Sequence, residues 1–488
     1  MREFLINHLK ENNTIFHMPG HKGPGIYRKY GFSDFLDHFM ECDITEIPGA
    51  DNLHQPEGII RDIQKRYESI YDVEKTYILV NGTSCGIVAS ILATVNRGGK
   101  MIVSRGCHRS VYSGLSLGGI TPCYVQPETT KEGIMGVLDW RKVASALDEN
   151  PEASAVILPS PNYYGICSDI EKIAEEVHKR GKILIVDQAH GAHLHLFEKY
   201  CKESCDLPRA AEDLGADIVI NSTHKTLATF TQTAILNVAS HRVDTFKLEN
   251  YLHMVQSTSP SYLLMCSHDI NSKIIKNHGQ EIFEGWLGDL KWFYKEAERK
   301  LTGVGPKSRD LIAKWDNLDY TKINIDASAI GWTGSMMEDF LMENRIVPEM
   351  VTDNLVVAMS GIGSVREDYC RLMEVLEAAV AAANSQLDSA GLEAKGTVLL
   401  EAASCEGMAG YPVTQVVDHG NKVIKLPLKD AVGYASGDVL IPYPPGIPIV
   451  CPGELVTGDI VAGIEKMSGE GRQVLGLSED GAIHVYEK

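Results

Sequence analysis

The sequence predicts an α/β protein with a mostly parallel central sheet, a small α+β domain and a C-terminal α+β domain. Apolar runs without polar alternation are separated by helical stretches over the first 290 residues. The runs lie at residues 77–80, 101–103, 155–158, 183–186, 217–220 and 234–236. Such runs are typical of strands buried on both faces of a parallel sheet. A mixed pattern and then a Gly- and Pro-rich segment follow, which predicts the two further domains.

The domain boundaries follow from the same changes of pattern. Residues 1–50 are expected to form an N-terminal arm, because Gly, Pro and His crowd the segment 17–25 too densely for regular structure. The large domain then spans 51–290, the small α+β domain 291–388 and the C-terminal domain 389–488. Helices are expected at 59–71, 290–301, 335–343 and 374–387, and strands at 322–325 and 354–359.

Composition argues against several classes of function. The 488 residues include 65 Asp and Glu against 46 Lys and Arg, a formal net charge of −19, which repels nucleic-acid phosphates and anionic lipid surfaces. No apolar stretch reaches the ~20 residues of a membrane-spanning helix, and the first residues lack the features of a secretory signal. The 11 cysteines are scattered without zinc-type spacing. We therefore expect a cytoplasmic protein with reduced thiols and no metal, which binds neither nucleic acid nor membranes.

A short polar turn follows the first apolar run. It reads Asn81-Gly82-Thr83-Ser84 and precedes an apolar helix. Free backbone N–H groups at a helix N-terminus, with the positive end of the helix dipole, suit a phosphate. An ordinary strand-to-helix turn with a Ser or Thr cap explains the same residues. This motif alone leaves both interpretations open.

Two further polar motifs follow apolar runs. Asp187 follows the fourth run, where open α/β sheets place ligands, and it either caps the next element or faces a ligand cation. Lys225 follows the fifth run in the segment Ser222-Thr223-His224-Lys225. A desolvated lysine amine is a candidate Schiff-base nucleophile, whereas a surface lysine is the ordinary alternative.

The order of these motifs is more specific than any one of them. The turn at 82–84 comes first, then His108 after the second run as a ring-stacking candidate, then Asp187 and Lys225. A pyridoxal phosphate enzyme of the aspartate-aminotransferase fold (fold-type I) needs a phosphate site, an acid that keeps the pyridine nitrogen protonated and a lysine that binds the aldehyde. The sequence therefore predicts pyridoxal 5'-phosphate as cofactor.

The chain resembles the Orn/Lys/Arg decarboxylase family in its short bacterial form, which has no N-terminal wing domain. The matching motifs are HMPGHKG at 17–23, DNLHQPEG at 51–58, NGTS at 81–84, STHK at 222–225 and PYPPGIPIVCPGE at 442–454. They are spread over nearly the whole chain, and the last one is more diagnostic than a glycine-rich turn.

The resemblance implies a role for each site residue. Lys225 is implied as the Schiff-base lysine, Asp187 as partner of the ring nitrogen, and His108 and Ala189 as the residues on the two faces of the ring. His224 is implied as a further catalytic residue. The other implied cofactor-binding residues are Gly82, Thr83, Ser84, His190, Ser222 and, from the neighbouring subunit, Ser257.

The resemblance also implies the reaction. It is decarboxylation of a basic L-amino acid, arginine first and then lysine or ornithine, to an amine of polyamine-type metabolism and CO₂. The cationic side chain of such a substrate requires a carboxylate, and an arginine guanidinium favours a bidentate one. The candidates in or beside the motifs are Asp43, Glu46, Asp51 and Glu454. Because the implied site is shared across an interface, a homodimer is the smallest functional unit expected.

Some features leave alternatives open. Gln188 stands where close short-form relatives often carry Glu, and Asn162 stands where the family usually has Thr. Both positions put the identity of the substrate in doubt if they lie near it. Another fold-type I reaction, such as transamination or elimination, and a non-catalytic homologue that regulates a true decarboxylase are the two rival functions.

Overall fold

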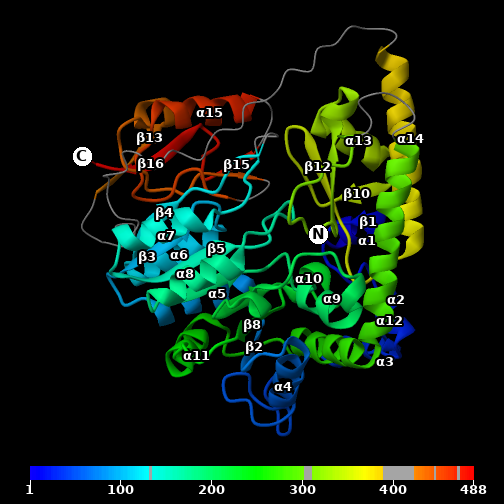
Figure 1. Cartoon of the computed structure of the whole chain (residues 1–488), viewed down its shortest axis with the longest axis horizontal. Helices are drawn as coiled ribbons and strands as arrows, with labels where there is room; N and C mark the ends of the chain where they lie inside the picture. Colours follow the sequence, from blue (N-terminus) through cyan, green and yellow to red (C-terminus); the bar gives the residue numbers. More distant parts are fainter. Residues whose placement is uncertain (131–133, 302–309, 388–421, 444–446, 470–472, 488) are drawn as a thin grey trace.

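A seven-stranded sheet forms the centre of the computed structural model, which describes residues 1–130, 134–301, 310–387, 422–443, 447–469 and 473–487 (Figure 1). The strands follow the order β2-β8-β7-β6-β5-β3-β4. Their bounds are Lys75–Leu79 (β2), Lys100–Ser104 (β3), Thr121–Val125 (β4), Ala153–Pro159 (β5), Ile183–Asp187 (β6), Ile218–Asn221 (β7) and Ala234–Val238 (β8). In this sheet β8 runs opposite to the other six strands, which are parallel to one another, so the expected mostly parallel sheet is confirmed.

One strand of the sheet, β4, was not predicted from the sequence. Strand β4 lies at the edge, and all its residues except Val125 are only partly buried. It also contains Pro122, which edge strands tolerate because one side of their backbone has no neighbour to bond. The apolar run that marks a doubly covered strand is therefore missing.

Helices cover both faces of the sheet, and successive residues of each strand alternate between them. In β5, Ala155 and Ile157 pack into one buried cluster, while Val156 and Leu158 pack into another. The first cluster includes residues of α5 (Gly82–Thr94), α6 (Arg109–Gly118) and α11 (Thr245–Val255). The second includes residues of α7 (Trp140–Glu149) and α8 (Ile170–Lys179). This double cover explains why the strands are apolar throughout.

A second layer joins the N-terminal arm to the small α+β region. Strands β9 (Lys322–Asp326), β11 (Met350–Val351) and β12 (Leu355–Met359) form an antiparallel sheet beside α13 (Gly334–Glu343). The arm contains α1 (Arg2–Glu11), β1 (Thr14–Phe16), α2 (Gly25–Lys29) and α3 (Ser33–Asp37). Strand β1 pairs in parallel with β10 (Ile346–Pro348), so the first residues complete a region more than 300 positions away. Residues 17–24 between β1 and α2 form turns, as expected.

Two long helices flank this second layer. Helix α12 runs from Tyr262 to Leu301, so the helix expected at 290–301 is only its last part, and α14 runs from Arg366 to Leu387 (Figure 1). The other expected elements of this region are confirmed, as is the helix at 59–71, which is α4 (Ile59–Tyr71). Because α12 spans residue 290, the proposed division at that position falls within one helix, and the domain boundaries stay a prediction.

The C-terminal region has its own buried core. Strands β13 (Val423–Pro427) and β16 (Ala482–Tyr486) pair, as do β14 (Ile441–Tyr443) and β15 (Gln473–Leu475), beside helix α15 (Gly458–Gly469). Residues 444–446 of the Pro-rich motif and the expected start of this domain at 389 lie outside the described residues.

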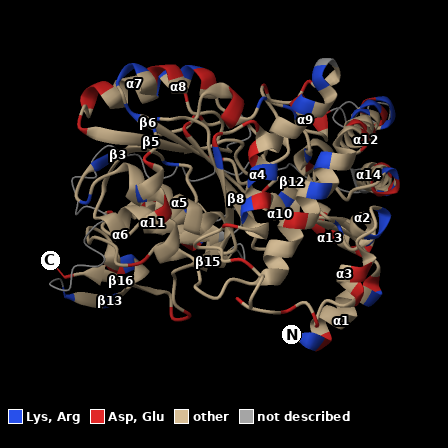
Figure 2. Ribbon diagram, turned by 90° about the horizontal axis from the view of Figure 1, so that it is seen from below, with Lys and Arg blue, Asp and Glu red and all other residues tan. Residues whose placement is uncertain are grey.

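Charged side chains gather on the outer helices. Figure 2 shows many Lys, Arg, Asp and Glu positions along α7, α8, α12 and α14, whereas the strands of the central sheet are mostly uncharged. No helix in the described ranges is long and apolar enough to span a membrane.

The parallel strands place several loops at one edge of the sheet. Strands β3, β5, β6 and β7 all end there, so the segments that follow Ser104, Pro159, Asp187 and Asn221 come together. Two short helices, α9 (Leu194–Cys201) and α10 (Thr223–Thr226), follow β6 and β7 at this edge. Open α/β sheets bind ligands at the carboxyl ends of their strands, so this edge is where a site is expected.

Candidate active site

A pocket lies at this edge of the sheet. It is lined by Thr83, Gly106, His108, Pro159, Pro161, Asn162, Tyr163, Asp187, Ala189, His190 and Lys225. Six of these residues are among those expected from the sequence. They come from helix α5, from the loops after β3 and β6, and from α10 after β7. The parallel topology thus brings together residues that are far apart in the chain.

Lys225 points its amine toward an imidazole. Its Nζ lies 2.9 Å from Nε2 of His190 and 5.9 Å from the centroid of the Tyr163 ring. Burial lowers the pKa of Lys225, although Asp187 and Glu349 act in the opposite direction. A lysine with a lowered pKa holds more of its amine in the neutral, nucleophilic form.

Asp187 is the last residue of β6 and is 6% exposed. Its Oδ1 accepts a hydrogen bond from the backbone N–H of Ala189 at 3.1 Å, which fixes the side chain at the strand end. Burial raises the pKa of Asp187, while the Lys225 cation opposes this rise. A buried carboxyl of this kind is stabilised in its ionised form when a cation occupies the pocket beside it.

His108 and His190 present neutral rings to the pocket. His108 caps α6, since its Nδ1 accepts a hydrogen bond from the backbone N–H of Ser110. Burial, together with nearby Lys225, lowers the pKa of His108 to about 4. The same causes place the pKa of His190 well below its usual range. Uncharged imidazoles at neutral pH are suited to stacking and hydrogen bonding rather than to holding an anion by charge.

Helix α5 begins at the pocket. Gly82 has a φ of +76°, which glycine adopts without strain, and Thr83 lines the pocket while Ser84 is exposed. Asn81 precedes the helix and makes no capping hydrogen bond with its side chain. The simple capping explanation therefore has no support at that position, and the first N–H groups of α5 are suited to an anion.

Five expected cofactor residues do not line the pocket in this chain: Gly82, Ser84, Ser222, His224 and Ser257. Ser222 is buried directly before α10, and the imidazole Nδ1–H of His224 donates to the carbonyl of Thr233 at 2.7 Å. Ser257 lies in an exposed loop, where its backbone N–H donates to Asn81 Oδ1 at 3.3 Å. The roles of these residues stay predictions.

The candidate substrate acids lie elsewhere as well. Asp43 and Glu46 are exposed on the arm. Asp51 accepts hydrogen bonds from four backbone N–H groups ahead of and within α4, and these bonds keep its pKa low although partial burial opposes them. Glu454 is 5% exposed and is bound to Arg105 at 3.2 Å. Asp51 and Glu454 are thus engaged in structural contacts, and none of the four lines the pocket.

Several pocket residues were not predicted from the sequence. Gly106 follows strand β3, Pro159 ends β5 as Asp187 ends β6, and Pro161 and Tyr163 follow β5. The carboxyl ends of those two strands were the signal that could have found them. Asn162, noted from the sequence as a departure from the family, does line the pocket, where its Oδ1 accepts two backbone N–H groups and its amide donates to Met135.

A buried ion pair behind the pocket also went unpredicted. Lys322 on β9 donates to Asp319 Oδ2 and to the backbone carbonyl of His190, each at 2.5 Å, and both charged side chains are fully buried. His193 lies 3.1 Å from the same carboxylate. A charged residue in a strand usually indicates an exposed position, so the sequence carried no sign of this pair.

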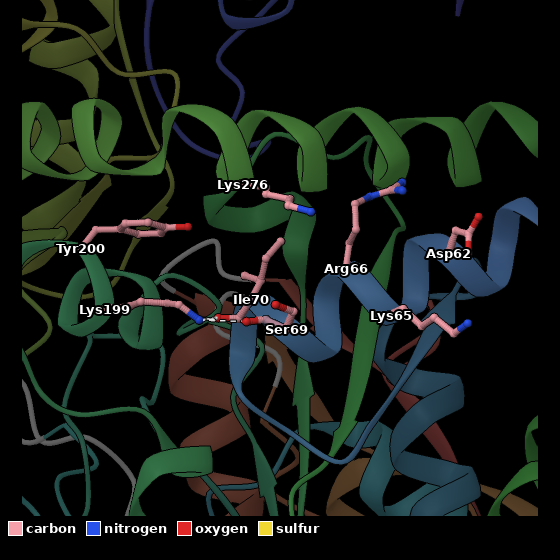
Figure 3. Close-up of a pocket in the computed structure, with 8 residues that line it drawn as sticks. All are labelled: Asp62, Lys65, Arg66, Ser69, Ile70, Lys199, Tyr200 and Lys276. Carbon is pink, nitrogen blue, oxygen red and sulfur yellow. Dashed lines mark hydrogen bonds between the residues drawn. The ribbon is translucent and has the colours of Figure 1, made fainter.

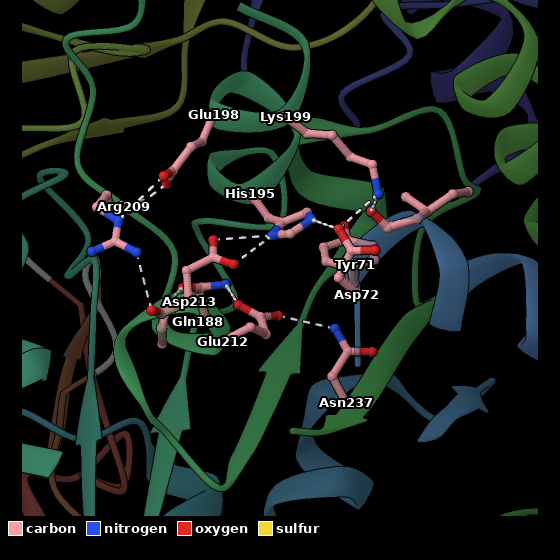
Figure 4. A network of polar contacts seen from close by, with 12 residues as sticks. Tyr71, Asp72, Gln188, His195, Glu198, Lys199, Arg209, Glu212, Asp213 and Asn237 are labelled. Carbon is pink, nitrogen blue, oxygen red and sulfur yellow. Dashed lines mark hydrogen bonds and ion pairs between the residues drawn. The ribbon is translucent and has the colours of Figure 1, made fainter. Parts of the chain in front are cut away.

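Gln188 faces away from the pocket. Its amide nitrogen donates to Glu212 at 2.8 Å and to Asn221 at 3.0 Å, and Glu212 also accepts from Asn221 and Asn237 (Figure 4). The network continues on the same side to the pairs of His195 with Asp213 and of Lys199 with Asp72. Gln188 therefore belongs to a hydrogen-bond network that supports the site, and it does not line the pocket.

The loop at residues 17–23 supports α10 from behind. The backbone N–H of Gly20 donates to the carbonyl of His224 at 2.7 Å, and Gly363 N–H donates to Gly20 at 3.0 Å. A Cβ on Gly20 would lie 2.4 Å from the carbonyl carbon of Thr226, so no other residue fits without a shift of the backbone. The glycine-rich motif thus fixes the helix that carries Lys225.

A second hollow lies between α4, α9 and α12 (Figure 3). It is lined by Asp62, Lys65, Arg66, Ser69, Ile70, Lys199, Tyr200 and Lys276. Lys199 Nζ lies 2.9 Å from the carbonyl of Ser69 and 2.7 Å from that of Ile70, so it binds the C-terminal end of α4. None of the expected site residues lines this hollow.

Comparison with known proteins agrees with this geometry. The model of the Orn/Lys/Arg decarboxylase major domain matches residues 1–368, and that of the family's C-terminal domain matches residues 413–479. The chain belongs to the Orn/Lys/Arg decarboxylase family. Its fold is accordingly the aspartate-aminotransferase-like fold (fold-type I) expected from the sequence.

Relatives of this decarboxylase family match along nearly the whole chain. The arginine decarboxylase of Halalkalibacterium halodurans is 31% identical, with 98% of this chain and 94% of that protein covered. The arginine decarboxylase of Bacillus subtilis is 30% identical, with 99% and 96% covered. Among solved structures, lysine decarboxylase A from Pseudomonas aeruginosa has a TM-score of 0.74 at 19% identity, with 99% of this chain and 80% of that chain covered.

Proposed function

We propose that this protein is a carboxy-lyase that uses pyridoxal phosphate to convert a basic L-amino acid to its amine and CO₂. The observation that carries the proposal is the joint placement of Lys225 and Asp187 in one pocket of a family member. Arginine is the first candidate substrate, because two relatives of about 30% identity over nearly the whole chain are named arginine decarboxylases. Lysine and ornithine follow.

The residues of the pocket fit the cofactor. Lys225 offers an amine for the aldehyde carbon, Asp187 a buried carboxylate for the ring nitrogen, and Thr83 with the start of α5 a setting for the phosphate. His108 and Ala189 are the residues proposed for the two faces of the ring. When bound, pyridoxal phosphate supplies an electron sink for the charge left on the substrate when CO₂ departs.

Two residues of this chain, Asp187 and Lys225, are proposed to hold and move the protons of the reaction. Asp187 holds a proton on the ring nitrogen, because an ionised carboxylate beside that nitrogen favours its protonated form. Lys225 would hold the cofactor through its amine, and once that amine is free its Nζ would be able to carry a proton. We infer that Lys225, with His190 at 2.9 Å behind it, returns this proton to the α-carbon.

Recognition of the basic side chain is proposed to require a second copy of the chain. The candidate acids Asp43, Glu46 and Asp51 lie on the arm or directly after it, outside the pocket of the same chain. Ser257 likewise lies in an exposed loop. A homodimer that brings such loops to the partner's pocket completes both sites. We place this enzyme in the cytoplasm.

The decisive experiment compares substrates on the purified protein. Release of CO₂ is measured with arginine, lysine and ornithine, with uncharged amino acids as controls, and the amine product is identified. We expect turnover with one basic substrate to exceed turnover with the controls by several orders of magnitude. Transamination without CO₂ release would favour another fold-type I reaction, and absence of any cofactor band together with absence of turnover would favour a non-catalytic homologue.

A further inference from the structure

Arg105 is a fully buried cation at the junction of the large and C-terminal regions. Its Nη1 donates to Tyr112 Oη at 2.8 Å and to the carbonyl of Pro448 at 2.9 Å, and its Nη2 donates to the carbonyl of Ile449 at 2.8 Å. Nη2 also reaches Glu454 Oε2 at 3.2 Å. Three of these four partners belong to the C-terminal region.

Arg105 directly precedes a residue that lines the pocket. That residue is Gly106, and His108 follows two positions later. Arg105 N–H donates to the carbonyl of Val125, and its own carbonyl accepts from Tyr112 Oη at 3.2 Å. The loop between β3 and α6 is therefore tied to its surroundings at the residue whose side chain reaches the C-terminal region.

The C-terminal side of this contact is hydrogen-bonded as well. Glu454 Oε2 accepts the backbone N–H of Cys451 at 2.7 Å as well as the Arg105 guanidinium. Cys451 is fully buried and packs in the core cluster of the large domain, beside Cys107 and Tyr112. Val450, one position earlier, bridges to Leu440 within the C-terminal fold. The segment 448–454 thus lies between the two cores.

A buried ion pair is not an efficient source of stability, because removing two charges from water offsets much of their attraction. A planar guanidinium with several fixed acceptors does, however, specify one orientation of the parts it joins. Apolar contacts between the same two cores are non-directional and do not specify an orientation in this way. The hydrogen bonds of Arg105 are therefore suited to fixing the orientation of the C-terminal region relative to the loop between β3 and α6.

We propose that Arg105 and Glu454 are positioning residues, through which the C-terminal region holds the β3–α6 loop and its residues Gly106 and His108 in place for the cofactor. The inference deepens the proposed function and rests on it. It assigns Glu454 to the support of the cofactor site, in place of the substrate recognition expected from the sequence.

The first measurement tests the contact itself. Unfolding of the cofactor-free full-length chain by urea is compared for Arg105→Met, Glu454→Gln and the double variant, with Lys425→Met as a control, because that exposed lysine pairs with Asp480 inside the C-terminal region. We expect the two single effects to be clearly non-additive and the control to resemble the wild type. Additive effects would overturn the proposal, whether or not the protein binds pyridoxal phosphate.

The second measurement tests the positioning role. Titration with pyridoxal phosphate is expected to give about tenfold weaker binding for Arg105→Met and for Glu454→Gln, with the KM for the amino acid changed less than about twofold. Unchanged cofactor affinity would overturn the role, and so would a KM effect of Glu454→Gln alone, which would mark a substrate acid. Failure of the wild-type protein to bind the cofactor would instead refute the proposed function.

Discussion

Three lysines near the pocket have different partners, and these partners decide which one can react. Lys322 is fully buried and is held by the Asp319 carboxylate. Lys22 donates to the backbone carbonyls of His17 and Met359, and burial lowers its pKa to about 7. Lys225 is the one of the three that lines the pocket, with an imidazole in place of a carboxylate as its near partner. Its amine is therefore not held as half of an ion pair.

Replacement of Lys225 by alanine is expected to abolish turnover and covalent attachment of the cofactor. The reason is that the variant lacks the amine that bonds the aldehyde and returns the proton. Its folding is expected to be close to that of the wild type. Borohydride reduction followed by peptide mass analysis checks the attachment, and CO₂ release checks the activity. Lys179→Ala, which changes an exposed lysine of α8, is the control and should behave like the wild type. Near-normal activity of Lys225→Ala would refute the mechanism.

Gln188→Glu is expected to destabilise the protein with little direct effect on substrate binding. The new carboxylate would face Glu212 at the present 2.8 Å contact, where an amide now donates. Like charges at that distance, in a partly buried network, should lower the free energy of unfolding by about 1–3 kcal/mol. Urea unfolding at neutral pH measures the loss.

The double variant Gln188→Glu with Glu212→Gln is the matched control for this network. It restores one amide and one carboxylate, so most of the stability should return. A large change in KM at unchanged stability would show instead that position 188 contacts the substrate.

At the scale of the elements, the loop around Gly20 and helix α10 act as one unit. Gly20→Ala would force a Cβ against the backbone of Thr226, so α10 must shift together with Lys225. We expect a lower melting temperature and weaker cofactor binding. Differential scanning calorimetry and cofactor titration measure the two effects.

Gly25→Ala is the matched control in the same segment. A Cβ at Gly25 would meet nothing within 4 Å, and this residue begins helix α2. The substitution should be neutral or slightly stabilising, since alanine favours helix. Equal effects of the two substitutions would refute the close approach of Gly20 to α10.

The sequence was sufficient to predict elements whose two faces are both buried. The apolar runs located six strands, and the common direction of β3, β6 and β7 explains why His108, Asp187 and Lys225 meet. Contacts between regions could not be read in the same way. Lys322 contacts His190 from another sheet, and Arg105 contacts Glu454 from another core. The residue type alone does not reveal whether a charged side chain lies in a buried pair or on the surface.

At the scale of the whole molecule, buried histidines make stability depend on pH. Burial lowers the pKa of His224 to about 4 and that of His268 to about 3, from an ordinary value of 6.5. Below pH 6.5 the unfolded chain takes up protons that the folded chain refuses, so stability is complete above this value and falls as the pH drops toward 4. At pH 5 each imidazole should cost about 2 kcal/mol relative to neutral pH.

Urea unfolding at pH 7 and pH 5 checks this prediction. His268→Gln removes one of the two groups, so the difference between the two pH values should shrink by about 2 kcal/mol. His241→Gln is the control, because that imidazole is 94% exposed and should leave the difference unchanged. An unaltered pH dependence in His268→Gln would contradict a neutral buried imidazole.

The pairing of β1 with β10 has a consequence for biogenesis. During translation, residues 14–16 emerge from the ribosome long before their partners at 346–348 and before the Gly361–Gly363 turn that meets Gly20. A nascent chain can therefore contain all seven strands of the central sheet before β1 is able to pair with β10. Such long-range closure is slow compared with local folding. The reactive amine acquires its finished surroundings only after translation has passed the small α+β region.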